Sequence, residues 1–414
     1  MIDILKKKLE EKIGRSITNR GDCELLSNII LETIDIEISF NTLRRLYGIL
    51  PSTNPNKKTL STLAQFLGYR NYFHFTQNYS YKEKIDLTET IYKAIAENDH
   101  EKIINLVNKT KNSSEDFVTM IIILLRELWH NEDYNLINRI FKLKALDFNS
   151  FSYYEILKLG NTVGLLIRAK SKIPDILLNN INFLESVFLI FVDYSSLNKY
   201  YAEALKVIKK NHVRDDIKLF TTAVLEFRNF LNNKSINEVD VNIIYNVKLH
   251  PILSGRLLSL KLLDADLNKT KEIIKTHRSS FKEECSWISH FYELFTTSIL
   301  LKNTEIMSYL IEKVNLKTNF YFEKNQLNSF YLMCLFYYKL IGDIKNEKKF
   351  FKSFELSNCR YSYKEFISLI YLIYLYDNST TIAIKNKIRT RYLNLSRKLN
   401  YSYFSEDFLL NYFD

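Results

Sequence analysis

Glycine and proline are scarce in this chain, and their scarcity limits the folds it can adopt. Only eight glycines and four prolines occur in 414 residues. Strand-rich domains need a turn about every 8–12 residues, and most tight turns use the positive φ of glycine or the fixed φ of proline. Hydrophobic residues make up 46% of the chain, enough for a substantial core. The sequence therefore predicts an all-α protein with long helices and short polar loops.

The few glycines and prolines are concentrated near the N-terminus. Four of the eight glycines and two of the four prolines lie in the first 80 residues. This change in composition predicts a small helical domain over residues 1–80 and a helical-repeat domain over residues 83–414.

Apolar residues at helical spacing predict four helices in the first 80 residues. Gly14 is placed to end the first helix, the second covers about residues 22–33, Ser39 begins the third, and Gly68 follows the fourth. The residues expected inside are Leu5, Leu9, Ile13, Leu25, Leu26, Ile29, Ile30, Leu43, Leu46, Tyr47, Leu60, Leu63, Ala64 and Leu67, closed by an aromatic cluster of Tyr69, Tyr72, Phe73 and Phe75.

The third and fourth expected helices carry a pattern known from DNA-binding proteins. Residues 39–48 read Ser-Phe-Asn-Thr-Leu-Arg-Arg-Leu-Tyr-Gly, and residues 59–69 read Thr-Leu-Ser-Thr-Leu-Ala-Gln-Phe-Leu-Gly-Tyr. With the proline-containing loop between them, residues 22–70 resemble a phage-repressor-type helix-turn-helix domain. In that family the second helix of the motif enters the major groove of double-stranded DNA. The resemblance implies that this role falls to the helix from Phe40 to Tyr47.

The same resemblance implies which side chains contact DNA. Arginine can bond guanine in two places, asparagine can do the same for adenine, and lysine suits phosphate. Two departures leave an alternative open: Cys23 to Ser27 replaces the usual glutamine-led helix, and Asp35 and Glu37 place acid beside the proposed DNA face. The alternative is a helical docking domain with solvated arginines. The DNA-contacting residues implied are Asn41, Thr42, Arg44, Arg45, Lys57 and Lys58.

Beyond residue 83, polar turns recur at the spacing of helical hairpins. Residues 96–100 and 129–133 form one pair of turns, and residues 301–304 and 341–343 form another. Stacked hairpins bury their apolar faces only against neighbours, which predicts an α-solenoid, although residues 145–285 cannot be phased. In hairpin length and in the turn at Gly342 the body resembles tetratricopeptide-type arrays. The whole layout is similar to peptide-sensing bacterial regulators, which implies a peptide or protein ligand.

A second group of basic residues lies near the C-terminus, with no acidic residue between Asn378 and Ser405. Tyr392, Tyr401 and Tyr403 are interleaved with it, an arrangement that suits single-stranded nucleic acid or an acidic protein tail. The alternative is a solvated face on a terminal capping helix. The basic residues are Lys385, Lys387, Arg389, Arg391, Arg397 and Lys398.

No recognisable motif for catalysis, a cofactor or a metal occurs. The four cysteines have no CxxC spacing, the seven histidines form no HxxxH pair, and no glycine-rich phosphate loop is present. The most apolar stretches, residues 117–125 and 366–376, are shorter than the roughly 20 residues that span a bilayer. We expect a non-enzymatic cytoplasmic protein without a cofactor or a membrane segment. The net charge of +11 is spread along the chain, so it identifies no partner by itself.

Three hypotheses follow. The first is a bacterial DNA-binding transcription regulator, which favours a homodimer because repressor-type heads usually bind two half-sites. The second is an interaction scaffold in which both parts bind protein and DNA has no role. The third is an RNA or single-strand binder that uses the C-terminal basic residues.

Overall fold

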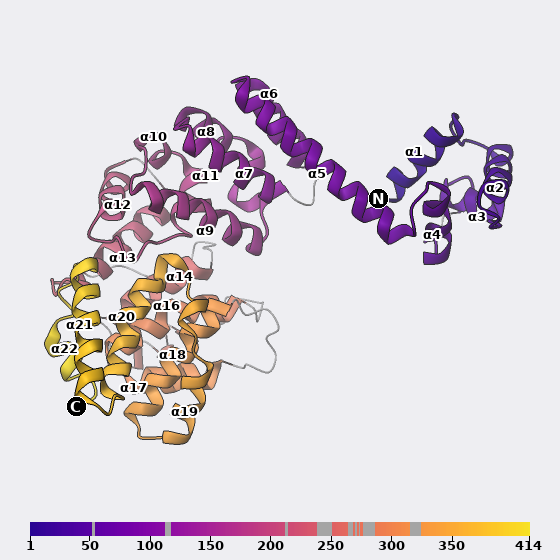
Figure 1. Cartoon of the computed structure of the whole chain (residues 1–414). Helices are drawn as coiled ribbons and strands as arrows, with labels where there is room; N and C mark the ends of the chain where they lie inside the picture. The colour runs from indigo at the N-terminus through magenta and orange to yellow at the C-terminus, as the bar shows by residue number, and fades with distance from the viewer. Residues whose placement is uncertain are drawn as a thin grey trace. The chain divides into compact units, whose positions relative to one another are not determined.

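The computed structural model describes residues 1–51, 54–111, 117–211, 214–237, 251–263, 268–269, 271–272, 274–275, 286–314 and 324–414. Every regular element in these ranges is a helix, so the predicted all-α class is confirmed (Figure 1). None of the helices described there combines the length and the apolar character that crossing a bilayer demands. The chain divides into two compact units, Met1–Ile103 and Ile104–Asp414.

The first unit contains the four helices expected near the N-terminus and a long fifth one. The expected boundary near residues 80–83 lies inside this fifth helix, which is 25 residues long. The division between the two units falls within the sixth helix. The six helices are α1 (Ile2–Ile13), α2 (Arg20–Ile34), α3 (Phe40–Leu46), α4 (Lys57–Phe66), α5 (Tyr72–Ala96) and α6 (His100–Lys111).

Local signals set the ends of these helices. Gly14 ends α1 with φ of 72°, a left-handed conformation that glycine adopts without strain. The Ser39 hydroxyl accepts a hydrogen bond from the backbone N–H of Asn41 and begins α3. Below the caps lies one apolar core, formed by Leu5, Leu9, Ile17, Cys23, Leu26, Ile30, Ile38, Leu43, Leu46, Leu60, Leu63, Ala64, Phe66 and Phe75.

Two residues expected in this core are exposed instead. Leu25 is 38% exposed, because the buried stripe of α2 runs through Cys23, Leu26 and Ile30, and Leu25 lies off that face. Phe73 is 67% exposed, whereas Phe75, two positions on, is fully buried. Both predictions were wrong because neighbouring apolar residues in one helix point in directions about 100° apart.

Every regular element in the described part of the second unit is a helix. Residues 238–250 and 276–285, in the stretch that could not be phased from sequence, lie outside the described residues. The elements are α7 (Phe117–His130), α8 (Tyr134–Phe141), η1 (Lys144–Leu146), η2 (Phe148–Ser150), α9 (Tyr153–Lys170), α10 (Asp175–Leu178), α11 (Ile181–Phe183), the π-helical turn η3 (Leu184–Phe188), α12 (Tyr200–Lys210), α13 (Asp215–Leu231), α14 (Pro251–Leu262), α16 (Ser286–Leu300), α17 (Thr304–Lys313), α18 (Lys324–Leu340), α19 (Ile344–Ser353), η5 (Leu356–Asn358), α20 (Tyr361–Asp377), α21 (Ile382–Leu399) and α22 (Glu406–Leu410).

The four hairpin turns predicted from sequence are confirmed, and they share one geometry. In each turn a left-handed residue ends the first helix, and the next residue, Asp or Asn, caps the second helix through its side chain. The side-chain oxygen of this Asp or Asn accepts a hydrogen bond from the backbone N–H three residues later, with N–O distances of 2.9 to 3.1 Å. The four pairs are Asn98-Asp99, Glu132-Asp133, Lys302-Asn303 and Gly342-Asp343.

A non-helical segment is buried against α9. Residues 189–197 lie between η3 and α12, and every one of them is buried. Two glycines of α9 allow this close approach: a Cβ on Gly160 would lie 2.6 Å from the Ser186 carbonyl oxygen, and one on Gly164 would lie 2.1 Å from Cγ of Phe191. We call residues 189–197 the buried segment, and it forms one wall of the cleft described below.

Candidate nucleic-acid interface and a cleft in the second unit

One face of helix α3 packs against the rest of the first unit. Leu43 and Leu46 are buried, and the Tyr47 hydroxyl donates to the Lys6 carbonyl oxygen of α1 at 3.2 Å. Of the four side chains expected to face DNA, Arg45 is exposed, while Asn41, Thr42 and Arg44 are half-buried. Arg45 is therefore the most accessible of the four.

Asn41 and Arg44 are brought together by the helix. Nη1 of Arg44 donates to Oδ1 of Asn41 at 3.1 Å. Nε of Arg44 is buried and has no hydrogen-bond partner among the described residues. Leaving a buried donor unpaired is unfavourable, so this guanidinium has capacity for a further acceptor. A base edge would have to displace or share the contact with Asn41.

Lys57 and Lys58 form the first turn of α4 and are exposed. The preceding cap, Asn56, accepts from the Thr59 N–H at 2.7 Å. Within the described ranges, no carboxylate pairs with Arg45, Lys57 or Lys58. The N-terminal end of α4 adds a partial positive charge to the two lysines, which together suit a phosphate.

The C-terminal basic residues do not form one surface. Three of them line an open groove between α20 and α21 with Glu365, and Arg397 lines a different groove. Lys385 lies over the ring of Tyr376, and Arg389 pairs with Glu406 of α22. The three in the shared groove are Lys387, Arg391 and Lys398.

The tyrosines expected to stack with bases are not available for it. Tyr392 and Tyr401 are 0% and 2% exposed. Their hydroxyls donate to the carbonyl oxygens of Ser405 and Tyr194, and that of half-buried Tyr403 donates to Leu300 at 2.6 Å. These rings pack the C-terminal helices, so the expectation of a stacking platform was wrong.

A cleft of about 460 Å³ opens in the second unit. Its walls come from α9, the buried segment, the start of α18 and the residues around the start of α20. Three carboxamides face it, and the side chain of Asn325 has no partner within the described part of the chain. Amides both donate and accept hydrogen bonds. The lining residues are Asn161, Thr162, Leu165, Phe191, Asn325, Asn358, Arg360, Tyr361 and Ser362.

The cleft narrows toward a buried ion pair. A small extension of about 30 Å³ shares Asn161, Asn325 and Arg360 with it and reaches Arg256 and Tyr194. Nε of Arg256 donates to Glu293 Oε1 at 3.0 Å, and the Tyr194 hydroxyl donates to the other carboxylate oxygen. Burial raises the pKa of Tyr194 well above its ordinary value, so this phenol stays protonated and acts as a donor.

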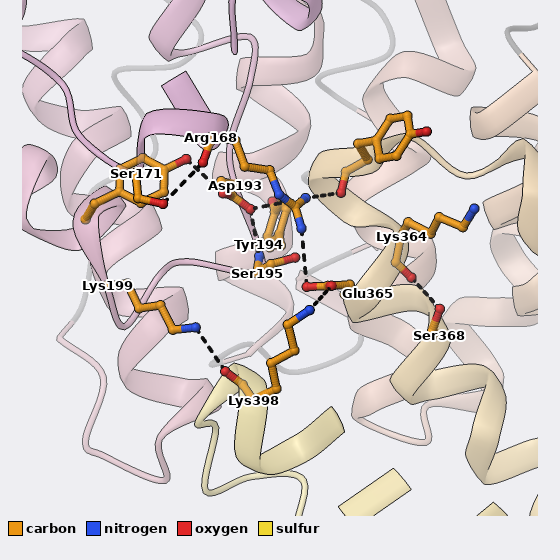
Figure 2. Close-up of polar contacts among 12 residues, drawn as sticks. Arg168, Ser171, Asp193, Tyr194, Ser195, Lys199, Lys364, Glu365, Ser368 and Lys398 are labelled. Carbon is orange, nitrogen blue, oxygen red and sulfur yellow. Dashed lines mark hydrogen bonds and ion pairs between the residues drawn. The ribbon is translucent and has the colours of Figure 1, made fainter. Parts of the chain in front are cut away.

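A second network links the cleft wall to the C-terminal helices (Figure 2). Arg168 of α9 lies between Asp193 of the buried segment, at 3.8 Å, and Glu365 of α20, at 3.3 Å. Its guanidinium also donates to the Tyr361 carbonyl oxygen. Glu365 pairs in turn with Lys398. Burial alone would raise the pKa of Glu365, but the contacts with Lys398 and Arg168 lower it, so the network holds a carboxylate.

The thiols offer no reactive group in the described part of the chain. Cys23, Cys334 and Cys359 are free and buried, and Cys285 lies outside the described residues. Burial raises the pKa of Cys359 to about 11 despite a hydrogen bond from Asn328. A thiol with so high a pKa is a poor nucleophile. Among the described residues, no group of His, Cys, Asp and Glu could hold a metal ion.

Sequence reasoning missed the cleft. Its residues come from positions as far apart as Asn161 and Ser362, so no local spacing reveals them. One signal was present: Gly160 and Gly164, one turn apart in an otherwise regular helix, indicate that another segment approaches α9 closely. No family model, curated protein or solved structure matches this chain.

Proposed function

We propose that this chain is a bacterial cytoplasmic DNA-binding transcription regulator. Its first unit would carry a helix-turn-helix domain of the phage-repressor type, and its second unit a solenoid of tetratricopeptide-like hairpins that binds a peptide or protein. The observation that carries the first half is the set of exposed cations Arg45, Lys57 and Lys58, which no described carboxylate neutralises. Such cations supply the salt-dependent attraction to phosphates on which duplex binding depends.

The cleft supports the second half of the proposal. An extended peptide has alternating N–H and C=O groups, which match side-chain amides such as those of Asn161, Asn325 and Asn358. The apolar wall at Phe191 suits a side chain of the ligand.

The first test is retention of fragmented genomic DNA by the purified protein at two salt concentrations, followed by sequencing. We expect a discrete site, palindromic if the protein is a dimer, whose retention falls at the higher salt. Lys7→Ala, an exposed lysine on α1, is the matched control for Arg45→Ala. Recovery of no DNA, or of DNA without sequence preference, would refute the regulator.

The second test concerns the ligand of the second unit. Protein purified from its native cells is denatured, and released peptides are identified by mass spectrometry. We expect a peptide with the wild type that is lost from Asn325→Leu and kept by Thr390→Ala, which lines the groove between α20 and α21 instead. A peptide kept by Asn325→Leu would place its binding elsewhere.

One observation favours the scaffold as the second candidate. Asp35 and Glu37, between α2 and α3, are both exposed. Acidic groups beside α3 repel phosphate and suit a basic protein partner. The scaffold predicts a stable protein complex and no salt-dependent duplex binding.

A further inference from the structure

A second groove in the second unit gathers cations from distant parts of the chain. It has a volume of about 400 Å³ and lies where the end of α13, the end of α21 and the residue Asn198 meet. No carboxylate is among the residues that line it. These residues are Asn198, Arg228, Asn232, Lys234, Ser396, Arg397, Asn400, Tyr401 and Ser402.

Cations at helix ends usually offset the helix dipole by capping terminal carbonyls. Here two amides and one lysine outside this set of cations already cap the carbonyls. Nδ2 of Asn232 donates to the Arg228 carbonyl oxygen at 2.7 Å, and Nδ2 of Asn198 donates to that of Asn400 at 2.6 Å. Nζ of Lys199 donates to the Lys398 carbonyl oxygen at 3.1 Å. Capping therefore does not account for Arg228, Lys234 and Arg397.

The guanidinium of Arg228 is held in place. Its Nε donates to Oδ1 of Asn198 at 2.8 Å, and the amide of Asn232 donates to the same oxygen at 3.1 Å. A half-buried guanidinium anchored at Nε keeps its two terminal nitrogens for another acceptor. Glu203 carries a negative charge near Arg228, but its carboxylate is hydrogen-bonded to Lys206 at 2.8 Å.

Lys234 and Arg397 complete the site. Both are exposed, and within the described part of the chain neither forms an ion pair. The groove thus presents three cations, and the side chains of Asn400 and Ser402 add hydrogen-bond donors. Its chemical complement is a compact anion rich in acceptor oxygens.

We propose that this groove binds the terminal phosphate of a small phosphomonoester, such as a nucleoside monophosphate. A phosphomonoester carries about −1.5 to −2 charges at pH 7 and three acceptor oxygens, which match three cations better than the single charge of a phosphodiester does. The volume is in the range of small-ligand pockets, about 300–1,000 Å³. This site is separate from the DNA contacts proposed for the first unit and does not depend on them.

The test is calorimetric titration of the full chain with AMP, with adenosine and with single-stranded oligodeoxyadenylate at fixed ionic strength. We expect saturable binding of AMP, none of adenosine, and a loss of affinity of about tenfold or more in Lys234→Ala/Arg397→Ala. Lys387→Ala/Arg391→Ala, in the groove between α20 and α21, removes the same charge and should bind AMP as the wild type does.

Three results would overturn the proposal. They are no binding of AMP, an equal loss of affinity in both double variants, and binding of the oligonucleotide without AMP, which would assign the groove to a phosphodiester backbone. All four substituted residues lie on the surface or in an open groove, so both variants should unfold at the wild-type temperature. A variant that melts earlier is replaced by the charge-removing pair Lys234→Gln/Arg397→Gln.

Discussion

Gly164 of α9 lies against the ring of Phe191 so closely that a Cβ at this position would be 2.1 Å from Cγ of Phe191. Gly164→Ala gains about 1 kcal/mol of helix propensity, but overpacking the contact costs typically 1–3 kcal/mol and more where backbone must move. We expect a net loss of up to about 2 kcal/mol, and more if the backbone has to shift, measured by chemical denaturation. Ala169→Gly, at an exposed position of the same helix, calibrates the propensity term. A stabilised Gly164→Ala protein would contradict this packing.

Local signals account for what the sequence predicted correctly. Each hairpin turn is specified by a few consecutive residues, in which a left-handed residue is followed by a capping Asp or Asn. The turns at Asn98, Glu132, Lys302 and Gly342 could therefore be predicted without tertiary information. Burial is decided by neighbours in space. The sequence alone therefore placed Leu25 and Phe73 inside, and could not distinguish Arg44 from Arg45 in exposure.

The hairpin turns provide a paired prediction. Lys302 and Gly342 occupy the same position in two turns, with φ of 53° and 75°. The left-handed conformation costs a residue with a side chain about 1 kcal/mol relative to glycine. Lys302→Gly should raise the free energy of unfolding by up to about 1 kcal/mol, and Gly342→Lys should lower it similarly. Thermal unfolding of both variants checks the prediction, and shifts of the same sign would contradict it.

The charged residues near the C-terminus show why a run of charge does not define a site. Arg397 and Lys398 are adjacent in sequence but line two different grooves of α21. Arg228 and Arg397 lie 169 positions apart in the numbering and line the same one. Helix geometry separates neighbours in sequence, and tertiary packing gathers distant residues. The phosphate site proposed above was for this reason invisible in the sequence.

Asp22 makes the first unit sensitive to acid. The Thr18 N–H at 2.9 Å, the Asn19 N–H and Arg15 together lower the pKa of this carboxyl below its ordinary value of 3.8. Because the pKa of Asp22 is lower in the folded protein than in the unfolded chain, the ionised carboxylate stabilises the fold at pH values above its unfolded-state pKa. This stabilisation is lost as the pH falls through the folded-state pKa.

The thermal midpoint of the first unit should therefore fall on acidification below about pH 4, and less steeply in Asp22→Asn. Asp22→Asn should also melt earlier at pH 7, because the acceptor of the capping box is weakened. Circular dichroism between about pH 7 and pH 3 measures both effects. Asp3→Asn, whose side chain is 94% exposed, is the control and should match the wild type at pH 7. Parallel pH profiles for wild type and Asp22→Asn would refute the role of Asp22.

The buried ion pair below the cleft should show strong coupling. Arg256 and Glu293 are 7% and 3% exposed, and Arg256 also bonds the carbonyl oxygens of the buried segment. Removing one member of a buried pair leaves the other uncompensated, at a cost of about 3–5 kcal/mol. Arg256→Met and Glu293→Gln should each destabilise by this amount, and the double variant by less than their sum. Additive losses in denaturant unfolding would show that the pair is not coupled.

Arg44 and Arg45 are adjacent on α3 but differ in what they can offer a duplex. Arg45 is exposed and unpaired within the described residues, which suits a contact with a DNA phosphate. If it makes such a contact, Arg45→Ala should weaken binding to all sequences and lower the slope of log affinity against log salt concentration by about one. Arg44 is hydrogen-bonded to Asn41, which suits a contact with a base edge. If it makes such a contact, Arg44→Ala should lose about 1–3 kcal/mol of binding free energy for the selected duplex and not for the scrambled one. Titrations of the selected and a scrambled duplex at several salt concentrations separate the two roles, with Lys7→Ala as the control. Equal effects of the two variants on both duplexes would reject a reading role for α3.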